Sequence, residues 1–530
     1  MESSKKQAVN SRFSLLILLA AELGILFSHL QADVTLPRVF GDNMVLQRDR
    51  PVPVWGKASP GEKVAITFAG QEKSTTADES GSWQVTLDPL PANKAPQSFI
   101  VAGKNKVTLE NVLVGEVWLC SGQSNMEWVV DKCANPEEEK AAAHFPEIRH
   151  FKVPRNSSAF PQADVKANWQ VCSPSTVGGF TAVGYYFGRE LFQQLDVPIG
   201  LMHSSWGGTS IEVWMSPESI GSSPELAELN AKVFSQSSLS PEGKKRHEDY
   251  LKDLKTWMAN TEDALAKDKP LTEPHAVPWP SWENPQPTQL YKGMIHPLAP
   301  FAMRGAIWYQ GESNGADASD VYLGKLRALI GGWRTKWNQG EFPFYIVQLA
   351  NFNKGSDDGK TWAGVRDAQR QALSISNTGL AVTIDIGESK DIHPKNKQDV
   401  GNRLALWALA GPYGKPTETS GPLYKSYSAE GSKIRISFEH AKDGLMIGKK
   451  EGLKPMEPNP TSELKWIEIA GEDRLFKPAR AVIEGSELVL SSPEVSSPVA
   501  VRYAYKQDPV GANLYNIQGL PAAPFRTDSW

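Results

Sequence analysis

Cysteine is scarce in this chain, with 3 residues in 530. An odd number allows at most one intramolecular disulfide, so a disulfide framework is excluded as the basis of the fold. The 9 histidines include no pair four residues apart with a glutamate between them, and the cysteines lack zinc-finger spacing. We therefore expect neither a metal ion nor a cofactor.

An excess of positive charge is also absent. Lys and Arg number 56 against 60 Asp and Glu, which gives a net charge of −4, and no block of basic residues occurs along the sequence. Proteins that bind nucleic acid usually present such a block or stripe to the phosphates. We therefore do not expect nucleic acid as a partner.

Long hydrophobic runs are confined to the first thirty residues. There, Lys5 and Arg12 lie before or at the edge of an apolar run at 13–27, and Ala32 follows as a small residue suited to a cleavage site. The run is shorter than the roughly 20 residues that cross a bilayer. We expect residues 1–32 to be an export signal, and the mature protein to be secreted or periplasmic without membrane association.

The chain is long enough for several domains, since 530 residues at roughly 150 per domain predict three or four. From 33 to 110, short β-type runs alternate with turn pairs, which predicts a small β domain. From 111 to 410 the pattern becomes strands alternating with helices, and from 411 to 530 short β-type runs return. We expect a central α/β domain flanked by β-rich, sandwich-like N-terminal and C-terminal regions.

The central region predicts a parallel sheet with helices on both faces, because strands and helices alternate along it. The expected strands cover 112–120, 199–203, 306–309, 345–349 and 381–384. The expected helices cover 182–195, 321–337, 362–373 and 399–410. Residues of about 217–290 are expected to be an insertion, with a charged helical part at 224–269 and a Pro- and Trp-rich part at 270–287.

Polar residues follow several of these strands directly. In an open α/β sheet, ligands bind beyond the carboxyl ends of the strands. The polar segments there begin at Ser121, His203 and Gln310, and a later loop carries Asp391 and His393. They predict that a serine, a pair of glycines, side-chain amides and a histidine gather at one edge of the sheet.

These residue types meet the needs of acyl transfer, which requires a nucleophile, a base, a carboxylate that orients the base, and N–H donors for the oxyanion. Ser124 lies at a strand-to-helix junction, and His393 precedes a proline that favours an extended loop. Taken singly, Ser124 has a simpler interpretation as a helix N-cap and His393 as a solvated surface residue. Their conjunction favours a hydrolase with a serine nucleophile.

Several residues compete for the supporting roles. Gly208 belongs to a glycine pair, which suits an oxyanion N–H or a plain tight turn. Gln310 and Asn314 offer amide donors. Glu312, between them, is suited either to orienting the histidine or to starting a helix, and Asp391 stands two residues before the histidine.

The combination resembles the SGNH (GDSL-like) hydrolase superfamily and, within it, the sialate O-acetylesterase family of carbohydrate esterases. The motifs that carry the resemblance are GQSNM at 122–126, WGGTS at 206–210, WYQGESN at 308–314 and DIHP at 391–394. The flanks are similar too, through VFGDNMVLQ at 39–47, VWG at 54–56, PVAVRY at 498–503, NLYN at 513–516 and GLP at 519–521. Nearly the whole mature chain is covered.

The resemblance implies a three-layer α/β hydrolytic domain with Ser124 as nucleophile and His393 as general base. It implies an oxyanion hole formed by the N–H groups of Ser124 and Gly208 with a side-chain amide. The superfamily's asparagine is replaced in register by Gln310 or Asn314, and Gln310 is preferred for that amide.

The partner of the histidine stays open between three candidates. Asp391 stands two residues before His393, whereas the superfamily's usual acid stands three before. In a related branch of carbohydrate esterases the glutamate of the QGE motif has this role, which corresponds to Glu312. We place Asp391 narrowly ahead of Glu312, and a backbone carbonyl is the third candidate.

The leading hypothesis is a secreted, metal-independent O-acetylesterase that removes acetyl groups from sugar hydroxyls through an acetyl-enzyme. The alternatives are an acetyl esterase for hemicellulose, such as xylan or xyloglucan, and a non-catalytic carbohydrate-binding protein. The expected partner is an acetylated sugar or glycan, and Trp279 and Trp282 of the insertion are candidates for contacting it. The sequence leaves the oligomeric state open.

Overall fold

The computed structural model describes residues 33–272, 285–353 and 362–530. The expected export segment at 1–32 lies outside these ranges, and so do Trp279 and Trp282. Within the described part of the chain, no helix is long and apolar enough to cross a membrane.

A mixed β-sheet forms the centre of the molecule. In order across the sheet, the strands are β13 (Thr378–Ala381), β12 (Phe344–Val347), β11 (Gly305–Tyr309), β7 (Lys106–Gly122), β10 (Ile199–Ser205), β8 (Ile148–Lys152) and β9 (Trp169–Val171). Neighbouring strands along this path run parallel except β8 and β9, which are antiparallel. The sheet is therefore not purely parallel, because β9 adds an antiparallel edge.

The predicted strands all occur, with shifted bounds. The strand expected at 381–384 ends at Ala381, because the apolar run continues into a buried loop rather than along the sheet. Strands β8 and β9 were not predicted from the sequence. In β8, Arg149 and His150 interrupt the apolar pattern, yet both side chains are buried.

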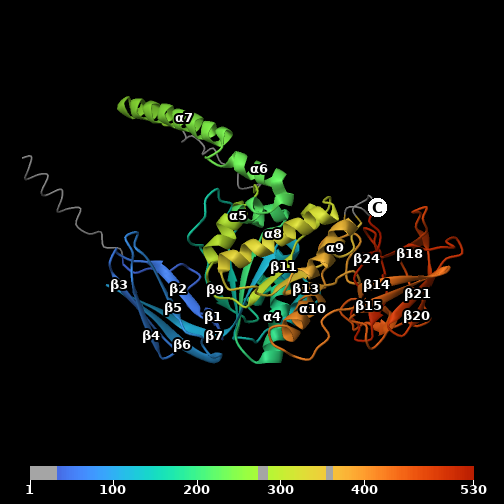
Figure 1. The fold of residues 1–530 in the computed structure, drawn as a ribbon. Coiled ribbons are helices and arrows are strands. Elements are labelled where there is room, and N and C mark those ends of the chain that lie inside the picture. Colours follow the sequence, from blue (N-terminus) through green and yellow to red (C-terminus); the bar gives the residue numbers. More distant parts are fainter. Residues whose placement is uncertain (1–32, 273–284, 354–361) are drawn as a thin grey trace, which may run out of the picture.

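Side chains alternate between the two faces of the sheet, as expected for extended strands. In β7, Val117 and Leu119 join one hydrophobic core, and Trp118 and Cys120 join the other. The first core includes α8 (Ser319–Trp337) and α9 (Trp362–Gln371), and the second includes α4 (Ala182–Leu195) and α10 (Lys397–Ala410). Helices thus cover both faces of the sheet (Figure 1).

Strand β7 connects the N-terminal β-rich region to the central sheet. Its first part pairs with β6, and its last part pairs with β10 and β11. One continuous strand therefore spans residue 110, where the sequence pattern predicted a boundary between two regions. The other strands of this region are β1 (Val45–Gln47), β2 (Val52–Lys57), β3 (Lys63–Phe68), β4 (Gln71–Thr76), β5 (Ser82–Leu87) and β6 (Asn93–Ala102).

The C-terminal region is also rich in β-structure. Its strands are β14 (Leu423–Glu430), β15 (Lys433–Glu439), β16 (Leu445–Lys449), β17 (Glu457–Pro458), β18 (Ile467–Ala470), β19 (Lys477–Pro478), β20 (Arg480–Glu484), β21 (Glu487–Ser491), β22 (Ala500–Tyr503), β23 (Leu514–Asn516) and β24 (Phe525–Arg526). The two β-rich regions lie on opposite sides of the central sheet (Figure 1).

The charged part of the insertion is helical. It forms α5 (Pro217–Gly221), α6 (Ala227–Gln236) and α7 (Pro241–Ala266). Helix α7 begins with a proline after Ser240, whose hydroxyl accepts the Gly243 N–H, an arrangement that favours helix initiation. The helix projects away from the rest of the molecule (Figure 1).

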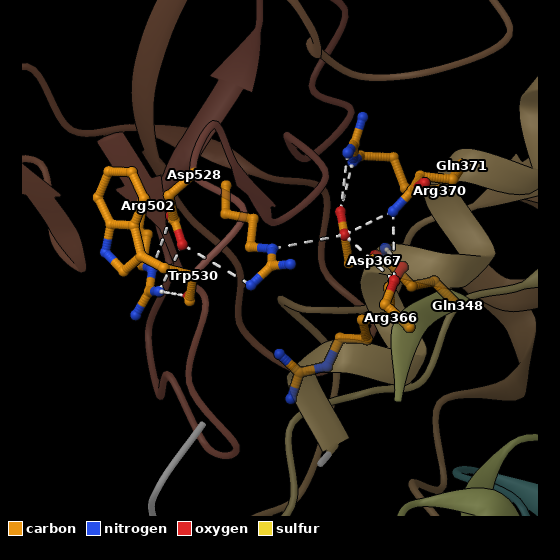
Figure 2. A network of polar contacts seen from close by, with 10 residues as sticks. Gln348, Arg366, Asp367, Arg370, Gln371, Arg502, Asp528 and Trp530 are labelled. Carbon is orange, nitrogen blue, oxygen red and sulfur yellow. Dashed lines mark hydrogen bonds and ion pairs between the residues drawn. The ribbon is translucent and has the colours of Figure 1, made fainter. Parts of the chain in front are cut away.

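Polar contacts attach the C-terminal region to α9. Arg366 is fully buried and donates to the carbonyl oxygens of Lys506 at 2.8 Å and of Gln507. Arg526 of the C-terminal region forms ion pairs with Asp367 of α9 at 4.0 Å and with Asp528 at 3.7 Å, and Asp528 also accepts from Arg502 at 2.6 Å (Figure 2). A buried guanidinium that donates to carbonyl oxygens of another region stabilises the contact between these two parts.

The same region reaches the loop that carries His393. The carboxylate of Asp508 accepts the side chains of Asn351 at 2.9 Å and Ser389 at 3.1 Å. Lys450 forms an ion pair of 2.7 Å with Asp399 in the first turn of α10. The C-terminal region therefore contacts both the histidine loop, at Ser389, and the helix that follows it.

Candidate active site

The predicted site residues gather at the carboxyl ends of the central strands. Ser124 follows β7, Gly208 follows β10, and Gln310 follows β11 directly. His393 lies in the loop between β13 and α10. The parallel strands bring these separate loops to the same edge of the sheet.

The turn that presents Ser124 depends on a glycine. Gly122 has φ +141°, and a Cβ atom there would lie 2.1 Å from the carbonyl oxygen of Tyr309 in β11. Gln123 is then the N-cap of the short helix α2 (Ser124–Glu127). The N-cap interpretation of Ser124 is therefore wrong: the serine is the first helical residue, and its hydroxyl points away from the helix backbone to a histidine.

Ser124 and His393 are in hydrogen-bond contact. The Ser124 hydroxyl lies 2.9 Å from Nε2 of His393, and the Trp128 ring stacks on the imidazole with 4.9 Å between centroids and 14° between planes. Burial lowers the pKa of His393, with Lys397 and Lys132 acting in the same direction and Asp391 against them. Burial thus favours the neutral imidazole, and the stacked Trp128 ring holds its plane beside the hydroxyl.

The two carboxylates proposed for the histidine have different surroundings. Asp391 has one oxygen 3.6 Å from Nδ1 of His393, and the same oxygen accepts the His393 backbone N–H at 2.9 Å. Glu312 is buried and accepts from the side chain of Asn125. Burial raises the pKa of Glu312, and its second oxygen has no hydrogen-bond partner among the described residues.

Two backbone N–H groups near the serine are free. Within the described ranges, neither the Ser124 N–H nor the Gly208 N–H donates to a protein acceptor. Gly208 has φ +76°, and its missing Cβ faces open space. Gly207 packs on Ser124, since a Cβ at Gly207 would lie 3.1 Å from that of the serine.

The amides of Gln310 and Asn314 are engaged inside the protein. Nε2 of the fully buried Gln310 lies 2.7 Å from Oδ1 of Asn314, 3.2 Å from Oε1 of Gln123 and 3.3 Å from the Thr209 oxygen. Asn314 Nδ2 faces Glu212 and Asp317. In this arrangement the two amides connect the loops that follow β7, β10 and β11, and neither presents a free N–H to the serine.

Sequence reasoning missed Asn125 and Lys397, although both lie inside the recognised motifs or just beyond them. Asn125 follows the serine directly, and its side chain contacts Lys397, Glu312 and the carbonyl of Ile392. Lys397 is fully buried. In the sequence, only their position in or near the motifs pointed to these two residues. The residue type gave no signal for Lys397, because a lysine in a polar loop normally predicts an exposed side chain.

A cavity of about 660 Å³ adjoins the serine loop. Its lining includes Glu127, Lys152, Arg155, His203 and Trp206. Glu127 binds Arg155 through both oxygens, at 2.8 and 2.6 Å, and also accepts the Gly207 N–H. The guanidinium lies 5.4 Å from the Trp206 ring, and burial lowers the pKa of His203 to about 3.

Cysteine plays no covalent part in the described fold. Cys120, Cys133 and Cys172 are buried free thiols, and burial raises the pKa of Cys133 and of Cys172 to about 12. Across the ranges that the structure describes, no group of three or more His, Cys, Asp or Glu side chains is arranged to hold a metal ion.

Comparison with known proteins finds carbohydrate esterases that are similar to this chain. The model of the family described as "Carbohydrate esterase, sialic acid-specific acetylesterase" matches residues 114–269 and 278–409. Sialate O-acetylesterase of Mus musculus is 30% identical over 527 residues, covering 91% of this chain and 92% of that protein. The Rattus norvegicus sialate O-acetylesterase is 31% identical over 535 residues, with coverages of 91% and 92%.

A solved structure is similar over almost the whole chain. The carbohydrate acetylesterase from Xanthomonas citri superposes with a TM-score of 0.78 and 37% identity, covering 94% of this chain and 100% of that one. Both β-rich flanks are therefore part of the similarity. The chain belongs to the sialic acid-specific acetylesterase family of carbohydrate esterases and is a carboxylic ester hydrolase.

Proposed function

We propose that the protein is a secreted carbohydrate O-acetylesterase that hydrolyses O-acetyl esters on sugars through a serine-bound acetyl-enzyme. The observation that carries the proposal is the 2.9 Å contact between the Ser124 hydroxyl and His393 Nε2, beside two unused backbone N–H groups. The central domain is then a three-layer SGNH-type hydrolase. Export rests on the sequence of residues 1–32 alone.

In the first half-reaction, His393 Nε2 removes the Ser124 hydroxyl proton as Oγ attacks the acetyl carbonyl carbon. The carbonyl oxygen becomes an oxyanion, and the N–H groups of Ser124 and Gly208 are available to donate to it. The tetrahedral intermediate then collapses. The sugar oxygen leaves with the proton from His393, and the acetyl group stays on Ser124.

In the second half-reaction, His393 removes a proton from water, and the hydroxide attacks the acetyl-enzyme. A second oxyanion forms in the same N–H environment. Its collapse releases acetate and returns the proton to Ser124 Oγ. Both halves need His393 neutral at the start, and the burial and cations that lower its pKa favour that state.

Asp391 is the best supported partner for His393. When Nε2 accepts from Ser124, the imidazole proton is on Nδ1, which faces the Asp391 oxygen at 3.6 Å. The alternatives are weaker. Glu312 is committed to Asn125, and among the described residues no backbone carbonyl accepts from His393.

We assign Gln310 and Asn314 to bracing the oxyanion loops. Each would have to leave a protein acceptor before donating to substrate, and breaking a buried hydrogen bond costs about 1–3 kcal/mol. Gln310 is further held by the Tyr322 hydroxyl, which donates to its Oε1 at 2.7 Å. The oxyanion hole then consists of the Ser124 and Gly208 N–H groups.

Acetylated sialic acid is the first candidate substrate, since the mouse and rat relatives are sialate O-acetylesterases. A neutral acetylated glycan such as xylan or xyloglucan is the second. One observation favours it: the arginine beside the serine loop, Arg155, is already neutralised by Glu127 at 2.6 Å. A sugar carboxylate would therefore compete with a protein carboxylate for that guanidinium.

The deciding experiment is acetate release by the purified mature protein on acetylated sialic acid, acetylated xylan and a small aryl acetate. We expect release that falls about 10⁴-fold or more in Ser124→Ala, since the covalent path is lost. Ser121→Ala is the matched control, because this buried serine has no hydrogen-bond partner for its hydroxyl among the described residues. Activity in Ser124→Ala close to that of the wild type would refute the mechanism.

A further inference from the structure

The side-chain amide of Asn125 lies between the nucleophile turn and the loop of the general base. Its Nδ2 donates to Glu312 Oε1 and, at 3.0 Å, to the carbonyl oxygen of Ile392, the residue before His393. Its Oδ1 accepts from Lys397 Nζ in the first turn of α10. One amide thus joins the loops that follow β7, β11 and β13.

The polarity of these contacts fixes the amide in one orientation. Its oxygen faces an ammonium group and its nitrogen faces a carboxylate, so a flipped amide would oppose like partial charges on both sides. Lys397, Asn125 and Glu312 are all buried, with at most 7% of any of the three exposed. The Lys397 ammonium also lies 5.2 Å from the centre of the Tyr309 ring. Asn125 therefore bridges a buried cation and a buried anion.

We propose that Asn125 is a positioning residue that holds His393 against Ser124, and that Lys397 both orients this amide and acts electrostatically on His393. The proposal rests on the proposed serine mechanism. It separates two effects of one lysine: a hydrogen bond that maintains geometry, and a charge that keeps the base unprotonated.

The effect of the Lys397 charge on His393 depends on the ionisable groups around both residues. Within the described part of the chain, the charges of Lys397 and Lys132 lower the pKa of His393 and that of Asp391 raises it. Burial lowers the pKa of Lys397 to about 8, opposed by Cys133, Glu312, Glu388 and Asp391. At neutral pH the ammonium is therefore largely charged, and removing it should raise the pKa of His393.

The first test compares Lys397→Gln with Lys397→Met in the hydrolysis of an aryl acetate. Gln keeps an N–H donor for Asn125 without the charge, and Met removes both. We expect both variants to move the acid limb of kcat/KM upward by about 0.5–1 pH unit. Only Met should also lower kcat on the plateau, by about 10²-fold, because only Met releases the amide.

Lys132→Met is the matched control. Lys132 also carries a positive charge that acts on His393, but it is exposed and lies 5.4 Å from the Trp128 ring rather than on Asn125. This variant should move the acid limb upward with kcat unchanged. An unchanged acid limb in both Lys397 variants, with wild-type kcat, would overturn the proposal.

A second test uses coupling between the buried charges. Lys397→Met removes the cation near Glu312, Glu312→Gln removes one of the acidic groups near Lys397, and the double variant removes both. We expect the loss of kcat in the double variant to be at least tenfold smaller than the product of the single losses. Losses that multiply without coupling would contradict a bridge through Asn125.

Asn125→Asp keeps the shape of the side chain but places a carboxylate against Glu312. We expect a kcat loss of about 10²-fold with KM for the aryl acetate changed less than threefold. Circular dichroism would show whether Lys397→Met folds. If it does not, Asn125→Asp still tests the positioning role. Wild-type kcat in folded Asn125→Asp would overturn the positioning role. Full activity in Ser124→Ala would instead refute the underlying mechanism.

Discussion

Ser124 Oγ and His393 Nε2 lie 2.9 Å apart although 269 positions separate them in the sequence. The contact forms because β7 ends at the glycine turn before Ser124, and the C-terminal region holds the loop of His393 from the other side. Each residue is therefore positioned by a different part of the chain. The two side chains differ in acid–base behaviour, because the imidazole, and not the serine hydroxyl, titrates near neutral pH.

The pH dependence of hydrolysis should show a lowered histidine pKa. Burial, Lys397 and Lys132 together outweigh Asp391, so the pKa of His393 lies below its ordinary value of 6.5. Because the base must be neutral, activity should be low below this pKa and rise through it to a plateau. We expect kcat/KM for an aryl acetate, measured from pH 4 to 9, to have its acid midpoint below 6.5. A midpoint above 6.5 would contradict this environment.

Replacement of the histidine's carboxylate partner should change both rate and pH dependence. Asp391 raises the pKa of His393, so Asp391→Asn should move the acid midpoint further down. We expect a plateau loss of about 10- to 100-fold, less than for a buried triad aspartate, because Asp391 is partly exposed. Glu388→Gln is the control: its carboxylate accepts the Lys395 N–H in the same loop. Equal losses in both variants would remove Asp391 from the orienting role.

The turn before the nucleophile should not tolerate a side chain. At Gly122 a Cβ would lie 2.1 Å from the Tyr309 carbonyl oxygen, and φ is +141°. We expect Gly122→Ala to lower the free energy of unfolding by at least about 2 kcal/mol, measured by urea denaturation. Gly179→Ala, where no atom lies within 4 Å of the added Cβ, should change it by less than about 1 kcal/mol.

The attachment of the C-terminal region should depend on one buried guanidinium. Arg366 donates to backbone oxygens at 504, 506 and 507, and burial lowers its pKa to about 9. Arg366→Met would leave these oxygens without their donor, so we expect a loss of about 3 kcal/mol or more in unfolding free energy. Within the described residues, the Lys506 side chain makes only a 3.6 Å ion pair with Glu468, so Lys506→Met should cost less than about 1 kcal/mol. Equal stability of both variants would contradict the role of Arg366.

Local pattern predicted much of the central fold, because the period of apolar residues identifies strands and helices. The helix expected at 182–195 has the same bounds in the structure. The pattern failed where buried polar residues break the period, as in β8 with Arg149 and His150. The pattern also predicted a strand as far as Ile384, whereas β13 ends at Ala381. The reason is that burial in a loop produces the same apolar run as burial in a strand.

The sequence by itself determined the family motifs, the alternation of strands and helices, and the residue types of an ester hydrolase. Only the tertiary structure decided the partners. It placed Asp391 beside His393 and Glu312 on Asn125, occupied the amides of Gln310 and Asn314 with protein acceptors, and buried Lys397. The physical reason is that a polar group in the interior is defined by the hydrogen bonds that compensate its lost hydration, and those partners come from distant loops.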